Sequence, residues 1–178
     1  IQEFLQTRGP AQLQDGVLND HVQLQTIVTV APNGLRARAR TREWNMLGVY
    51  QQSGQWEDGI FENTYVKESG VWKFEALHYY PTYITDYEKG WTVDAQPAPG
   101  VMAALPPDAP PSVVYEIFPK AHVPAFHYRN PVSGNTATYP QVGAPSAASI
   151  AATLFEPSAY QAAPVQNIAN AVTSAEQL

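Results

Sequence analysis

The chain contains no cysteine among its 178 residues, so disulfides and thiolate metal sites are excluded. Basic residues are few: ten Lys and Arg stand against sixteen Asp and Glu, giving a net charge of −6. Because binding to phosphates needs a basic face, we expect no nucleic-acid partner. No apolar run approaches the roughly 20 residues of a membrane-spanning helix, so we expect no membrane partner. The chain shows no signal peptide and opens on Ile1 rather than Met, which indicates a fragment or a processed product.

Charge and proline divide the chain into two parts. Eight of the ten Lys and Arg precede Trp91, whereas thirteen of the sixteen Pro follow it. We predict a packed domain over residues 1–92 and an extended Pro/Ala-rich arm over residues 93–178. Such an arm cannot build a large core alone, although it carries scattered apolar and aromatic residues. We therefore expect it to pack on the domain or on a neighbouring subunit, with extended pieces adding to a sheet edge.

The first part has the period-two alternation of β-strands. Four strands are predicted, over residues 22–30, 35–50, 56–67 and 71–80, joined by hairpin turns such as Asn33-Gly34. Alternation places Val22, Leu24, Thr26, Val28 and Val30 on one face of the first strand, and His21 with Gln23 on the other. In the fourth strand, Trp72, Phe74, Ala76, His78 and Tyr80 are predicted to share a face.

The second predicted strand carries four arginines at alternate positions. Arg36, Arg38, Arg40 and Arg42 must project from one face of the sheet. A solvated or interface face with acidic partners on the next strand explains this pattern best. An anion-binding site is the alternative, for which the spacing is unspecific.

Two adjoining stretches carry a family resemblance. Residues 54–68 give a polar strand; residues 69–80 give a Gly70 turn, then Val-Trp-Lys-Phe and Leu77-His78. This order resembles the SnoaL-like domains of the NTF2-like superfamily, with ketosteroid isomerase and scytalone dehydratase among its members. The Asp20-His21 pair is similar to the start of the corresponding strand in dehydratase-like members.

The resemblance implies an α+β fold with a cone-shaped, curved antiparallel sheet. Only a short helical stretch precedes Gly9-Pro10, so we expect little N-terminal helix. The helices that usually close the cone are then lost, not included, or carried by a separate N-terminal polypeptide.

Enzymes of this superfamily that lack cofactors move protons with a base and buried hydrogen-bond donors. The resemblance therefore implies a lyase, dehydratase or isomerase acting on a small aromatic or polycyclic substrate. His78, His21 and Asp58 are the candidate catalytic groups. Each also has a structural interpretation: a core or interface histidine, a polar face against a partner, and a solvated turn aspartate. The candidate pocket wall consists of Tyr50, Trp44, Trp56, Trp72, Phe74 and Tyr80.

No pattern of metal ligands is evident, and we expect neither a metal nor a cofactor. His122 and His127 lie five residues apart around Pro124, which is not the spacing of a helical zinc pair. Two other functions remain open. The chain could be an assembly protein whose arm is exchanged between subunits of a homo-oligomer or a filament. It could also be a module that binds an apolar or aromatic ligand without converting it.

Overall fold

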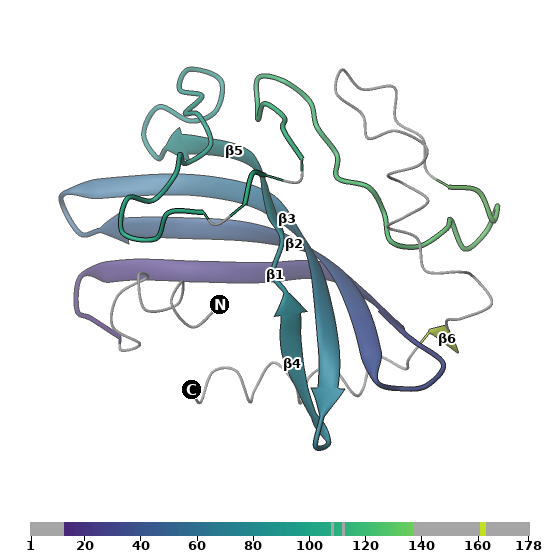
Figure 1. Cartoon of the computed structure of the whole chain (residues 1–178). Helices are drawn as coiled ribbons and strands as arrows, with labels where there is room; N and C mark the ends of the chain where they lie inside the picture. Colours follow the sequence, from purple (N-terminus) through teal and green to yellow (C-terminus); the bar gives the residue numbers. More distant parts are fainter. Residues whose placement is uncertain (1–12, 108, 112, 137–160, 163–178) are drawn as a thin grey trace.

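The computed structural model describes residues 13–107, 109–111, 113–136 and 161–162, and these form a strongly bent antiparallel sheet (Figure 1). Five strands make up the sheet, with a two-residue sixth at its edge. They are β1 (Val17–Val30), β2 (Arg36–Val49), β3 (Ser53–Glu68), β4 (Val71–Ala76), β5 (Tyr79–Asp86) and β6 (Gln161–Ala162). The described residues include no helix, and therefore none long and apolar enough to cross a membrane.

Strand β3 is the centre of the sheet. The order is β4-β3-β2-β1-β6, and β5 pairs with β3 as well. The first half of β3 carries β5 and its second half carries β4, while β2 pairs with β3 along its whole length. The curved antiparallel sheet confirms that part of the predicted fold class. The predicted N-terminal helix and about half of the predicted arm lie outside the described residues, and the domain division near residue 92 stays a prediction.

The predicted fourth strand is wrong as one continuous element. Regular pairing ends at Ala76 and resumes at Tyr79, so that β4 and β5 are separate strands on the same partner. Opposed residues share a face, and Phe74 lies opposite Tyr65 whereas Tyr80 lies opposite Ile60. Trp72 and Phe74 therefore project from one side of the sheet and Tyr80 from the other.

The first strand was also predicted with the wrong alternation. A β-bulge interrupts the pairing of β1 with β2 between Leu24 and Ile27, and Gln25 takes a positive φ of 53°. A bulge adds one residue to one strand and so reverses the alternation beyond it. Val28 accordingly falls on the same face as His21, not with Leu24.

The sheet has two faces, an arm face that contacts the described part of the arm and an inner face on the opposite side. The arm face bears Arg40 and Arg42 of β2, with Glu62 opposite Arg40 and Asp58 diagonally across from Arg42 on β3. The inner face bears Glu43 and Asn45 of β2, with Gly59 and Glu57 opposite. In Figure 1 the described part of the arm follows the outer side of the bend, over the arm face.

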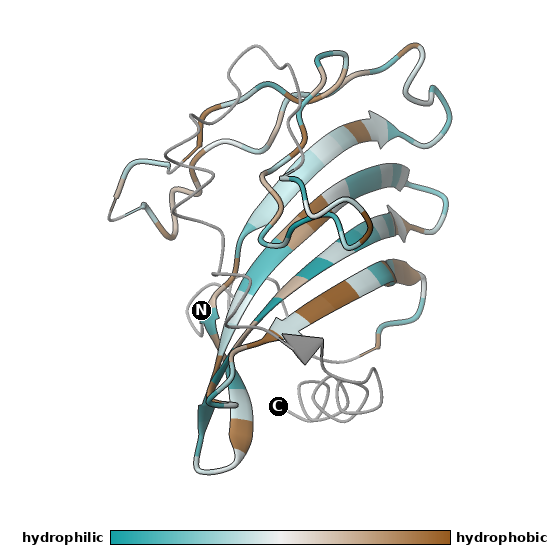
Figure 2. Cartoon of the chain, turned by 90° about the vertical axis from the view of Figure 1, so that its right-hand side faces the viewer, coloured by the Kyte–Doolittle hydropathy of each residue, from teal (hydrophilic) through white to brown (hydrophobic). Residues whose placement is uncertain are grey.

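Polar residues dominate the interior of the described part. Five apolar side chains are buried there, against eight polar or charged ones. Figure 2 shows the same mixture, with hydrophilic and hydrophobic segments alternating along the strands. Because buried polar groups need partners, the interior depends on hydrogen bonds and ion pairs rather than on one apolar slab.

The described part of the arm is held on the arm face by backbone and side-chain contacts. Phe118 N donates to Thr82 O at 2.8 Å, and the Tyr115 hydroxyl donates to Pro81 O at 3.1 Å. Ile117 is buried. Residues 113–118 form no strand, because their contacts with β5 are single bonds rather than a ladder.

Gly59 allows the Tyr79 ring to lie across β3 on the inner face. A Cβ atom at position 59 would come within 2.4 Å of the ring and 2.5 Å of the hydroxyl oxygen. Gly59→Ala is expected to displace this ring and to lower the free energy of unfolding by about 1–3 kcal/mol, as overpacking does. Urea denaturation measures the loss. Gly100→Ala is the matched control, since a Cβ there meets nothing within 4 Å; equal midpoints for the two variants would contradict the prediction.

Candidate functional site

A buried carboxylate, Glu43, organises the inner face. Its side chain lies in the middle of β2 and the residue is 5% exposed. Oε1 accepts hydrogen bonds from Gln23 Nε2 at 2.7 Å and from the His21 ring at 3.1 Å, and Oε2 accepts one from Asn45 Nδ2 at 3.0 Å. Three donors from two strands therefore hold a charge that would be costly to bury alone.

His21 is the titratable group of this cluster that reaches solvent. Its side chain is 32% exposed, with Nδ1 against Glu43 and Nε2 2.9 Å from Asn19 Oδ1. Glu43 beside Nδ1 fixes the ring, and Nε2 can take a proton only once the Asn19 oxygen moves away from it, because an amide oxygen accepts and cannot donate. The arrangement is a histidine–carboxylate dyad on the inner face.

Tyr79 places a hydroxyl group on the other side of Glu43. The hydroxyl is buried, and the Glu57 carboxylate is the acceptor beside it. Burial raises the pKa of Tyr79 far above its usual range, and the nearby charges of Glu57 and Glu43 raise it further. The group therefore stays protonated at any ordinary pH and can donate a hydrogen bond to a substrate oxygen.

Asp58, predicted as a catalytic base, lies on the arm face, opposite to His21. Both of its oxygens accept hydrogen bonds from Arg42, at 2.8 and 2.7 Å. Burial raises the pKa of Asp58, more than the Arg42 guanidinium lowers it. A bidentate pair of this kind is a structural tie across β2 and β3, and it confirms that part of the arginine face has acidic partners on the next strand.

His78, the other predicted base, lies in the break between β4 and β5. Its side chain is exposed and meets the Tyr80 ring edge-on at 6.5 Å. Its backbone is tied to β3, since His78 N donates to Asn63 Oδ1 and His78 O accepts from Glu62 N. His78 lies level with Glu62 of β3, and His21 lies level with Glu57. These two β3 positions are five residues apart, which is about 17 Å at the rise of a strand. The structure therefore does not bring the two histidines together.

The residues predicted as a pocket wall are divided between the faces and the ends of the sheet. Trp44 stacks on Trp56 at 5.2 Å, and Trp56 on Tyr87 at 5.8 Å, on the arm face. Tyr50 is 75% exposed at the β2–β3 turn. A shallow groove at this end of the sheet is lined mostly by apolar and aromatic residues, among them Leu18, Met46, Trp56 and Tyr87. The groove can hold an apolar ring but offers no acid or base.

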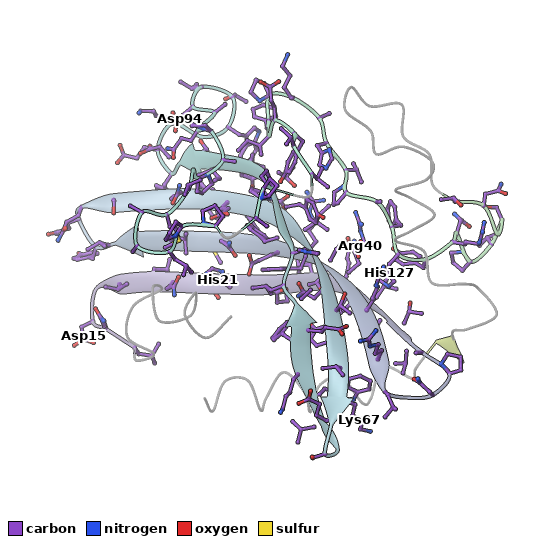
Figure 3. All side chains as sticks on the ribbon, viewed as in Figure 1. Asp15, His21, Arg40, Lys67, Asp94 and His127 are labelled. Carbon is purple, nitrogen blue, oxygen red and sulfur yellow. The ribbon has the colours of Figure 1, made fainter. Side chains whose placement is uncertain are left out.

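A second buried polar cluster, which the sequence did not reveal, joins the arm to the sheet. Glu62 pairs with Arg40 and accepts a hydrogen bond from His127 Nδ1 at 2.8 Å, and His127 Nε2 lies 3.2 Å from Thr29 Oγ1. Arg40 also donates to Pro124 O at 3.2 Å. Figure 3 shows Arg40 and His127 together at the bend, well apart from His21.

These two clusters differ in what they can do. His127 is 2% exposed and fully occupied, so the arm-face cluster is a structural junction. The inner-face cluster, which consists of His21, Glu43 and Tyr79, has a partly exposed imidazole and a buried hydroxyl, which suits proton transfer. Neither cluster resembles a metal site: within the described ranges, no three His, Asp or Glu side chains are arranged to hold an ion.

Comparison with known families matches residues 1–78 to the SnoaL-like domain. The match spans β1 to β4 and ends just before β5, so it includes His21, Glu43 and Gly59 but not Tyr79 or the arm. Among curated proteins, none matches the chain.

Proposed function

Because residues 1–78 are a SnoaL-like domain of the NTF2-like superfamily, we propose that the chain is a cofactor-independent lyase, dehydratase or isomerase. The substrate is a small aromatic or polycyclic compound, and catalysis is general acid–base. The family match supports the isomerase and dehydratase class as a whole. The choice of His21, Glu43 and Tyr79 as the reacting groups rests on the geometry of the inner face.

The observation that carries the proposal is the His21–Glu43 dyad beside the Tyr79 hydroxyl. His21 takes a proton from a carbon next to a carbonyl group, and Glu43 offsets the charge on the resulting imidazolium. Tyr79 donates a hydrogen bond to the carbonyl oxygen as negative charge develops there. Returning the proton to another carbon gives an isomerase, and giving it to a β-hydroxyl, which then leaves as water, gives a dehydratase.

Loss of α-hydrogen tests the proposal without knowledge of the natural substrate. Aromatic ketones such as 2-tetralone are incubated with the protein in D₂O, and the α-proton signals are followed by NMR. We expect exchange faster than in buffer alone, unchanged by a chelator. No acceleration with any enolisable ring ketone would contradict the proposal.

Assembly remains a second candidate because β1 has an open edge. Beyond its two-residue pairing with β6, β1 has no second ladder partner among the described residues. Its side chains Val17, Leu18, Leu24 and Ile27 are each 38% exposed or more. An apolar edge strand can pair with a strand of another molecule. A compact monomer in sedimentation would argue against this candidate and leave the catalytic proposal unaffected.

A further inference from the structure

The groove at the end of the sheet has a floor without side chains. Leu18 of β1 lies opposite Gly48 of β2, which in turn lies opposite Gly54 of β3. Tyr87 continues this row, since its backbone N donates to Gly54 O at 2.9 Å. All four residues line the groove. The two glycines therefore separate an apolar wall on β1 from an aromatic wall that follows β5.

The groove is suited to a neutral, apolar partner. In the part of the chain that the structure describes, no charged residue lines it, so an ionised ligand would lose its hydration there without compensation. Trp56, Tyr87 and the exposed Tyr50 contribute rings with hydrogen-bond donors. The volume of about 740 Å³ is within the roughly 300–1,000 Å³ of ligand pockets. A partner rich in carbonyl groups fits best, because donors line the groove.

The arm carries a loop with these properties. Residues 97–114 contain six prolines and one charged residue, Asp108. Residues 106–111, the proline segment, hold two proline pairs in which Pro107 and Pro110 have Pro-x-x-Pro spacing. Proline favours the polyproline II helix, whose carbonyl groups are free to accept hydrogen bonds. Grooves lined by aromatic residues bind such helices in many recognition domains.

The length of the proline segment agrees with that of the groove. The lining residues run from Leu18 of β1, across β2 and β3, to Tyr87 after β5. Three spacings between neighbouring strands make about 14 Å. The proline segment rises about 16 Å from its first to its last residue in polyproline II geometry. It can therefore contact both walls along the whole groove.

The proline segment does not lie in the groove of its own chain. Within the described ranges, no residue after Tyr87 lines the groove, and the four prolines of the segment are exposed. The loop that carries the segment is tied to β5 on both sides. Gln96 N donates to Ile84 O at 3.0 Å before it, and the Tyr115 hydroxyl donates to Pro81 O at 3.1 Å after it. The segment is thereby presented on the surface.

We propose that the groove is a receptor for polyproline II helices and that it binds the proline segment of a second copy of this chain. Two copies that exchange their segments about a two-fold axis form a closed dimer. The inference does not depend on the catalytic proposal, because neither His21 nor Glu43 lines the groove.

Peptide binding tests the receptor. A dye-labelled peptide of residues 103–114 is titrated with the whole chain by fluorescence anisotropy, beside the same peptide with Pro107 and Pro110 replaced by Ala. The parent peptide is expected to bind about tenfold more tightly, because proline holds it in the bound conformation. In the whole chain, Tyr50→Ala should weaken binding about tenfold, as loss of an aromatic anchor does. Val132→Ala is the control, since Val132 is 95% exposed outside the groove.

Sedimentation of the whole chain tests the occupant. The parent should pass from monomer to dimer as its concentration rises. The double variant Pro107→Ala/Pro110→Ala should remain a monomer at concentrations where the parent is a dimer. Pro131→Ala changes an exposed proline outside the proline segment and should associate like the parent.

The contrary outcomes are distinct. Equal affinity for the two peptides, or no binding of either at millimolar concentration, would overturn the receptor. A monomeric parent whose double proline variant binds the peptide more tightly would place the segment in its own groove and overturn the exchange between copies. Association that persists unchanged in the double variant would belong to another surface, such as the β1 edge, and would also overturn the exchange.

Discussion

His21→Ala is expected to slow ketone exchange by about 10²–10⁴-fold, the usual contribution of a positioned general base. His21 is hydrogen-bonded to Glu43 and its side chain reaches solvent, so the variant loses the candidate base of the inner face. Because the buried Glu43 keeps its bonds from Gln23 and Asn45 but loses the one from His21, the removal should cost about 1–3 kcal/mol of stability. Rates from NMR exchange, read together with urea midpoints, separate loss of the base from loss of the fold.

The comparison with His78→Ala decides between the two predicted bases. His78 is exposed in the β4–β5 break, and among the described residues no carboxylate is hydrogen-bonded to its ring. If His78→Ala abolished exchange and His21→Ala did not, the reaction would belong to the other side of the sheet. Glu88→Gln serves as the surface control for handling and concentration.

Glu62→Ala is expected to lower the free energy of unfolding by about 3–5 kcal/mol, because it leaves a buried guanidinium without its acid. Arg40 is 8% exposed and His127 is 2% exposed, and both depend on Glu62. The residual bonds from Arg40 to arm carbonyls cannot neutralise its charge. Urea denaturation followed by tryptophan fluorescence gives the change.

The chain offers its own control for this prediction. Glu75 pairs with Arg36 at 2.6 Å, but the two side chains are 34% and 57% exposed. An exposed ion pair contributes about 0–1 kcal/mol, so Glu75→Ala should be nearly neutral. If the two variants lost the same stability, the Arg40–Glu62 pair would not be a buried support of the sheet.

The long strands could be predicted because alternation and turn residues both mark them. The Asn33-Gly34 turn and the Ser69-Gly70 turn lie where hairpins form, and the bounds of β2 agree with the prediction to within one residue at each end. The bulge at Gln25 could not be predicted, since a positive φ there has no glycine to announce it. One unmarked residue was enough to reverse the faces beyond it.

The site could be predicted only in part, although the sequence of β2 contains the residue that completes it. The family resemblance indicates His21, but nothing in the resemblance indicates its acid partner Glu43, which alternates with the four arginines on β2. The residues alternating with them are Thr41, Glu43 and Asn45, which makes β2 polar on both faces over this stretch. A strand that buries polar groups on both faces indicates function or a network on each. Tyr79 is one of several tyrosines that the sequence offers as hydrogen-bond donors, and nothing in the sequence singles it out. The role of His127 could not be predicted, since its partners Glu62 and Thr29 lie on distant strands.

The connectivity of β3 has a consequence for the order in which the molecule assembles. The β2–β3 and β3–β4 pairs are neighbours in sequence, so their contacts close short loops and form early. The bond from Arg40 to Pro124 spans 84 residues and needs a far longer loop. During synthesis, Arg40 and Glu62 can therefore meet before His127 has left the ribosome. The arm then arrives at an ion pair that is already in place, and the sheet acts as a template for the described part of the arm, up to residue 136.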